Sequence, residues 1–122
     1  MITANDAHGA HGAVATVLER RRDDLLELSR GIHGDAELGF EEHTSSARVA
    51  DLLDAAGFDV THGTAGMDTA VVATAGSGPL EVGICAEYDA LPGVGHACGH
   101  NIIAAAGVGA ALALAEVADD VG

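Results

Sequence analysis

The sequence predicts an α/β layered domain, because segments with helical and strand-like patterns succeed one another along the chain. Apolar residues recur at helical spacing over residues 13–30 and again over 44–56. Short runs with a β-rich composition follow, at 58–61, 69–75 and 80–86. A long apolar stretch rich in Ala and Gly, at 101–118, predicts a buried helix.

Glycine, proline and polar residues mark the expected limits of these elements. Residues 1–12 are aperiodic and rich in Gly, Ala and His, so we expect a flexible tail ahead of a single domain. Gly31 is expected to end the first helix, and Gly57 to cap the second in a left-handed conformation. The turn Gly-Ser-Gly-Pro should join the second and third strands in a β-hairpin whose second strand is central.

Charge and hydropathy restrict the classes of partner. The formal net charge is −14, there is no lysine, and all five arginines lie at or before Arg48. Nucleic acids and anionic membranes are bound by clustered Lys and Arg, so we expect neither as a partner. The apolar run at 102–115 is also shorter than the ~20 residues that span a bilayer.

The two cysteines indicate a reducing compartment. Cys85 and Cys98 do not form a disulfide framework, and the first residues show neither a basic nor an apolar targeting segment. We therefore expect a cytoplasmic protein. Cys85 lies inside an expected strand and is interpreted as a small hydrophobic core residue.

The residues that carry chemistry gather between the last expected strand and the last helix. His96, Cys98 and His100 alternate within five residues, shortly after Glu87 and Asp89. Thiolate and imidazole are preferred ligands of zinc-like metals, and Cys98 and His100 are placed to face one ion. The Asp89 carboxylate is suited to accept the second ring N–H of a ligand histidine. Glu87 is expected beside the ligands or facing the substrate.

Other residues near this cluster have less specific interpretations. His96 fits a supporting or structural role better than that of a ligand, and Asn101 is expected beside the ligands or facing the substrate. His33 and His43 flank a polar connector and are weaker candidates to line the site. Glu41 and Glu42 are interpreted as surface or helix-start charges.

Two other kinds of site remain as alternatives. A structural zinc site normally takes four protein ligands in two pairs, whereas this chain shows one cluster. A Cys98 nucleophile with His96 or His100 as its base is a rival, although such close neighbours rarely reach nucleophile–base geometry.

Two segments resemble a known family. Residues 32–60 begin IHGDAELGFEEH, and residues 86–101 read AEYDALPGVGHACGHN. Both are similar to segments of the dinuclear-metal amidohydrolases and peptidases, a family that includes aminoacylase, carboxypeptidase G and the auxin-conjugate hydrolases. Within it, the chain most resembles the branch of aminobenzoyl-glutamate hydrolase and β-alanyl-dipeptidase-like enzymes.

The resemblance implies a fold and a set of ligands. Residues 13–122 would be the N-terminal portion of a zinc-peptidase-like catalytic domain, in which helices flank a central mixed β-sheet that is incomplete here. Cys98 corresponds to a position that bridges two metal ions, and His100 to a terminal ligand of one ion. Asp89 corresponds to an orienting acid, while Glu87 stands where other branches have histidine. The implied cofactors are two divalent ions, zinc or manganese.

The resemblance also implies a reaction, which is the metal-dependent hydrolysis of an amide. Expected substrates are an N-acyl amino acid, an aminobenzoyl-glutamate-like compound or a small dipeptide, and the full-length protein would be a homodimer. The family's catalytic Glu-Glu pair and its lid and dimerisation domain have no counterpart in the sequence, so we expect the 122 residues alone to be inactive. The alternative is a non-catalytic truncated remnant that acts as a weak metal-binding or interaction module.

Overall fold

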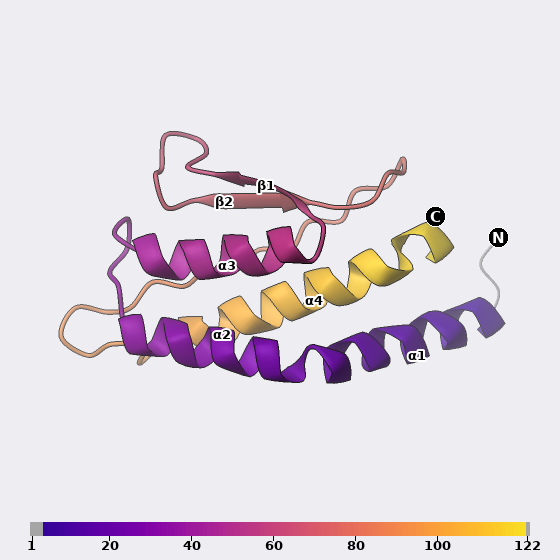
Figure 1. The fold of residues 1–122 in the computed structure, drawn as a ribbon, viewed down its shortest axis with the longest axis horizontal. Coiled ribbons are helices and arrows are strands. Elements are labelled where there is room, and N and C mark those ends of the chain that lie inside the picture. The colour runs from indigo at the N-terminus through magenta and orange to yellow at the C-terminus, as the bar shows by residue number, and fades with distance from the viewer. Residues whose placement is uncertain (1–3, 122) are drawn as a thin grey trace.

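The computed structural model describes residues 4–121, which form layers of helices with one small sheet (Figure 1). The elements in chain order are α1 (Ala4–Arg20), α2 (Arg22–Asp35), α3 (His43–Ala55), β1 (Asp59–His62), β2 (Val71–Thr74) and α4 (His100–Val121). Helix α4 lies against α1 and α2, and α3 lies between α2 and the sheet. The predicted α/β class is confirmed in this coarse sense, as a mixture of helices and strands.

The first helix is longer than the sequence suggested. It begins at Ala4, so residues 4–12 are helical where we expected a flexible tail. Alanine has the highest helix propensity of all residues, and it recurs through this segment often enough to outweigh two glycines. Contact between α1 and α4 further stabilises the helix.

The single helix expected over 13–30 is two helices. The backbone leaves the helical region at Arg21, which has φ −94° and ψ 3°. Gly31 does not end α2 but lies inside it. Its missing side chain leaves room for the Arg48 guanidinium, since a Cβ there would lie 2.9 Å from the Arg48 Cζ. The helix ends later, where Ala36 takes up a left-handed conformation with φ 45°.

The next three elements lie close to their expected positions. Helix α3 starts and ends one residue before the expected 44–56, and Gly57 follows with φ 90°, a conformation that glycine adopts at little cost. Strands β1 and β2 pair antiparallel with each other, with Asp59 opposite Thr74. The sheet formed by these two strands packs on α3.

The third expected strand is absent, and this corrects the sequence-based prediction. Residues 80–86 form no strand, so β2 pairs with β1 and not with this segment. Leu80 and Val82 are 77% and 66% exposed, and Cys85 is exposed and not a core residue. A β-rich pattern becomes a strand only where another strand binds its backbone, and within residues 4–121 none does. The expected central mixed sheet is therefore a two-stranded sheet in this structure.

Helix α4 contributes most to the core but is not buried on all sides, as we had expected. The core residues share a position between α4 and the other helices: Val17, Leu28, Ile32, Val49, Leu53, Ala104, Val108, Leu112 and Ala113. Ile102 and Leu114 are exposed on the same helix. Residues 100–118 have the length and mean hydropathy (1.8) of a membrane-crossing helix, and 39% of that stretch is buried. The core helix of a soluble protein has the same length and hydropathy.

Candidate metal centre

Three titratable side chains meet where the chain enters α4. Glu87 and Asp89 lie at the end of a long segment that returns from β2, and His100 is the first residue of α4 (Figure 1). One ligand atom from each residue lies within 4.8 Å of the other two. These three residues form the acid–histidine group, whose donors are two carboxylates and one imidazole. Such a set is suited to Zn²⁺ or Mn²⁺.

The contact between His100 and Asp89 fixes the state of the imidazole ring. The His100 Nδ1 atom lies 2.8 Å from the Asp89 Oδ1 atom and 3.0 Å from the Asp89 carbonyl oxygen. Both neighbours are acceptors, so Nδ1 must carry the hydrogen and donate it. The neutral ring then has its lone pair on Nε2, which is the nitrogen available to a metal ion.

The electrostatics of the group favour positive charge on His100. The hydrogen bond to the Asp89 side chain raises the pKa of His100, and it outweighs partial burial, which lowers this pKa. The negative charges of Asp89 and Glu87 raise it further. The Glu87 Oε2 atom lies 3.8 Å from the His100 Nε2 atom, and the Glu87 side chain is 58% exposed. A divalent cation near Nε2 would be attracted by the same negative charges of Asp89 and Glu87.

The segment that carries the two carboxylates is anchored on both sides of Asp89. The Tyr88 hydroxyl donates a hydrogen bond to the Thr69 carbonyl oxygen, and the pKa of Tyr88 is raised by burial and by the charge of Glu42. The Ala90 N–H donates to the Glu37 carbonyl oxygen at 2.7 Å. These bonds hold the backbone of Asp89 relative to the loop between β1 and β2 and to the connector between α2 and α3.

The structure does not bring Cys98 into the acid–histidine group. Cys98 is an exposed free thiol in the turn before α4, and it is not among the ligand atoms that lie within 4.8 Å of one another. His96 also lies apart, with its Nε2–H donating to the Ile32 carbonyl oxygen at 3.0 Å and its ring stacked on His33. Metal ligation by Cys98 therefore stays a prediction.

Asn101 has a structural contact in this arrangement. It is buried, and its side-chain amide donates to the Ser29 hydroxyl at 3.0 Å and to the Ser29 carbonyl oxygen at 3.3 Å. The first turn of α4 is thereby tied to α2 directly after His100. Asn101 helps to fix the position of the histidine in this way, and its expected role beside the ligands or facing the substrate stays a prediction.

Sequence reasoning missed two acidic residues of the connector. Glu42 is buried, not a surface charge, and its carboxylate accepts a 2.6 Å hydrogen bond from the Thr69 hydroxyl. Glu37 accepts hydrogen bonds from two backbone amides at the start of α3. The only available sequence signal was a carboxylate shortly before a helix, where the helix dipole favours negative charge.

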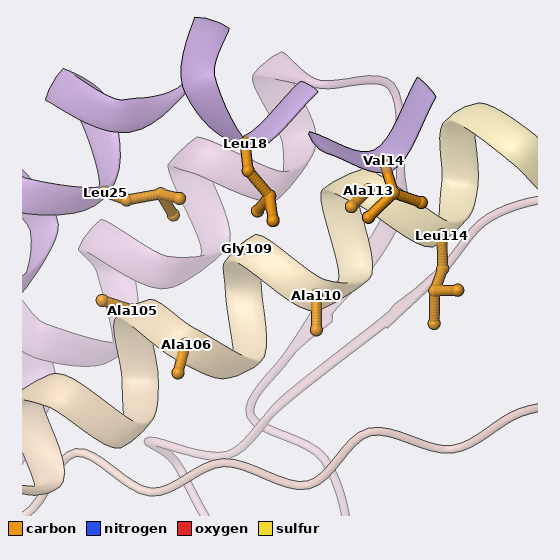
Figure 2. A pocket seen from close by; sticks show the side chains of 9 residues that line it. All are labelled: Val14, Leu18, Leu25, Ala105, Ala106, Gly109, Ala110, Ala113 and Leu114. Carbon is orange, nitrogen blue, oxygen red and sulfur yellow. The ribbon is translucent and has the colours of Figure 1, made fainter. Parts of the chain in front are cut away.

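An apolar hollow of the surface lies elsewhere. Figure 2 shows it between α1, α2 and α4, where Leu18 and Leu25 face the small residues of α4 around Gly109. Its volume is about 480 Å³, and all of its lining residues are aliphatic or glycine. It shares no residue with the acid–histidine group and offers no chemistry for catalysis.

Comparison with known proteins identifies the relatives of this chain. No family model matches it. It is 39% identical over 108 residues to Xaa-Arg dipeptidase of Mus musculus, an alignment that covers 80% of this chain and 25% of the dipeptidase. It is 31% identical over 114 residues to one of the subunits of p-aminobenzoyl-glutamate hydrolase of Escherichia coli, covering 80% and 24% of the two chains. It is 34% identical over 113 residues to thermostable carboxypeptidase 2 of Saccharolobus solfataricus, covering 80% and 28%.

Over four-fifths of its length the chain is similar to hydrolases of peptides and amides. The resemblance identified from its motifs is thereby confirmed, and the relatives named above are all hydrolases of peptides or amides. The chain spans about a quarter of the length of these relatives. In this family context, the acid–histidine group is the part of the structure with the chemistry of a metal centre.

Proposed function

We propose that this chain forms one side of the metal centre of an amidohydrolase or peptidase. The substrate would be an N-acyl amino acid, an aminobenzoyl-glutamate-like amide or a small dipeptide. The observation that carries the proposal is the hydrogen bond from His100 Nδ1–H to Asp89, which leaves Nε2 for a metal ion beside Glu87. The relatives, whose names denote hydrolysis of a dipeptide, an aminobenzoyl-glutamate and a C-terminal peptide bond, support the same class of reaction.

As part of this proposal the complete site takes two divalent ions, zinc or manganese, and the acid–histidine group supplies two carboxylates and one imidazole to it. His100 and Glu87 would act as ligands, Asp89 would fix the orientation of the imidazole, and Cys98 would add a thiolate from the adjacent turn. When bound, such ions polarise an amide carbonyl and lower the pKa of a bound water. Asp89, which orients the imidazole and is not itself a ligand in this proposal, is important because orienting carboxylates raise the basicity of a ligand histidine.

We further propose that the 122 residues alone do not hydrolyse an amide. Residues 13–122 would be the N-terminal portion of the catalytic domain, with the general-base glutamate supplied by other protein. The substrate carboxylate needs a cationic partner, and residues 49–122 contain neither Lys nor Arg. The name of one relative denotes a subunit of a larger assembly, which supports a site built from more than this polypeptide. We also propose that the full-length protein is a homodimer in the cytoplasm. Metal-dependent release of an amino acid from an N-acyl amino acid by the purified chain would refute this part of the proposal.

Calorimetric titration tests the metal centre itself. Zn²⁺ or Mn²⁺ is titrated into the wild type, His100→Ala and Cys98→Ala, with Glu81→Ala as a matched control because Glu81 is an exposed acid on the same segment. The affinity should fall by about tenfold or more in the first two variants and stay unchanged in the control. Equal affinity in all four proteins would show that these residues are not ligands.

A second candidate is a non-catalytic module that binds metal weakly and contacts another polypeptide. Exposed apolar side chains favour it, since Leu80, Val82 and Ile102 lie on the surface. In the same titration, a Zn²⁺ dissociation constant of about 1 mM that His100→Ala leaves unchanged would favour this module over the enzyme.

A further inference from the structure

The segment that carries Glu87 and Asp89 has little backbone support of its own. Among residues 4–121, no backbone–backbone hydrogen bond joins residues 75–89 to any other part of the chain. The first such bond after this segment is the one from the Ala90 N–H to the Glu37 carbonyl oxygen, at 2.7 Å. Ala90 is 3% exposed, and it forms an isolated parallel bridge with Leu38. The backbone of Asp89 is therefore held on one side by the bond from Ala90 to Glu37, and on the other by the side chain of Tyr88.

Glu37 is itself held by its side chain. Its two carboxylate oxygens accept hydrogen bonds from the backbone N–H groups of Thr44 at 2.8 Å and Ser45 at 2.7 Å. Both amides belong to the first turn of α3, where N–H groups have no partner within the helix. The residue immediately before α3, Glu42, makes no side-chain capping bond, so Glu37 provides this cap.

The charge of Glu37 is maintained in this position. Burial raises the pKa of its carboxyl, but the hydrogen bonds from Thr44 and Ser45 lower it by more, so the pKa is lower than usual. The positive end of the α3 dipole favours the ionised form as well. The carboxylate is therefore a permanent acceptor at neutral pH.

We propose that Glu37 is a positioning residue for the metal centre, acting through Ala90 on the alignment of Asp89 with His100. This inference rests on the proposed function, because it assigns a role within the same site. Glu37 is not among the three residues whose ligand atoms lie together. The Glu37 carboxylate fixes the connector to α3, and the Glu37 carbonyl oxygen fixes Ala90. Asp89, the residue before Ala90, orients the imidazole of His100. Gly39 lies close to Asp89, since a Cβ there would be at ordinary contact distance, 3.9 Å, from the Asp89 Oδ2 atom.

The test reads the tautomer of His100 in the metal-free chain. Ring ¹⁵N chemical shifts of histidine-labelled protein, at a pH that leaves the ring neutral, should show hydrogen on Nδ1 in the wild type. Glu37→Ala should reduce this tautomer by half or more, and Glu37→Gln, which keeps one acceptor oxygen, should lie between them. Glu41→Ala, the loss of a neighbouring exposed carboxylate, should change nothing. His100→Ala assigns the resonance among the seven histidines.

The tautomer ratio of His100 in the Glu37 variants decides whether Glu37 is a positioning residue. A wild-type tautomer ratio in Glu37→Ala, with unchanged far-ultraviolet circular dichroism, would overturn the positioning role. Should that variant unfold, Glu37→Gln decides by the same criterion. A parallel Zn²⁺ titration should show affinity lowered by about tenfold in Glu37→Ala. If the wild type binds no Zn²⁺ while its tautomer still depends on Glu37, the proposed function fails and the structural coupling stands.

Discussion

Replacing Gly107 with alanine probes how closely α4 approaches the segment that leads into the metal centre. Gly107 lies inside α4, and a Cβ at this position would come within 2.8 Å of the Ala86 Cβ atom, next to Glu87. Ordinary contact begins at 3.4 Å, so α4 and the segment around Ala86 would have to separate by about 0.6 Å or more. Because Ala86 has no flexible side chain, its backbone must move.

Two opposing free energies determine the result. Replacing glycine with alanine in a helix interior stabilises it by about 1 kcal/mol. Overpacking costs about 1–3 kcal/mol, and the lower end applies here because the segment of Ala86 lacks backbone hydrogen bonds and is able to yield. The free energy of unfolding should therefore stay unchanged or fall by up to about 1 kcal/mol.

Gly12→Ala is the matched control, because Gly12 lies in α1 with nothing within 4 Å of its added Cβ. This variant should be more stable than the wild type by about 0.5–1 kcal/mol. Urea unfolding followed by circular dichroism measures both changes. If Gly107→Ala stabilises the chain as much as Gly12→Ala does, the close approach of α4 to Ala86 is refuted. A tenfold loss of Zn²⁺ affinity in Gly107→Ala alone would show that the displacement reaches Glu87.

Three further predictions concern the residues around the metal centre. Because the pKa of His100 is raised above its ordinary 6.5, its bond to Asp89 stabilises the fold below that pH, and the contribution is lost as the pH rises through the raised pKa. Asp89→Ala should thus cost about 1 kcal/mol more at about pH 5.5 than at about pH 8.5 in metal-free urea melts, and equal costs would contradict the ion pair. Asn101→Ala should lower stability by about 1–2 kcal/mol through loss of its bonds to Ser29, and a change under about 0.3 kcal/mol would show that they contribute nothing. Ala36→Gly should raise the melting temperature, since φ is 45° there and glycine relieves about 1 kcal/mol of strain; a lower melting temperature would speak against this conformation.

Helical periodicity predicted the fold best where an element packs along one face. Helix α3 lies within one residue of its expected position, because its apolar spacing and the following Gly57 act locally. The expected helix stop at Gly31 was wrong, because α2 continues to Asp35. Arg48, in another helix, occupies the space that a side chain at Gly31 would take, so the glycine serves a contact and not a cap.

The candidate site was predictable in composition but not in assembly. Asp89 and His100 are near each other in sequence, so a loop and a helix start are enough to bring their side chains together. The contribution of Glu37 could not be predicted, because it lies 53 positions before Ala90 and fits no standard capping pattern. Contacts of this kind depend on how α2, α3 and the returning segment pack.

The sequence by itself determined the approximate positions of α3 and α4, the resemblance to amide and peptide hydrolases, and the presence of carboxylate and imidazole donors between residues 87 and 100. Only the tertiary structure decided that residues 80–86 stay unpaired, that Cys98 lies outside the acid–histidine group, and that the connector supports Asp89. The physical reason is that helices satisfy their backbone hydrogen bonds within one segment, whereas strands and metal centres need partners that are distant in sequence.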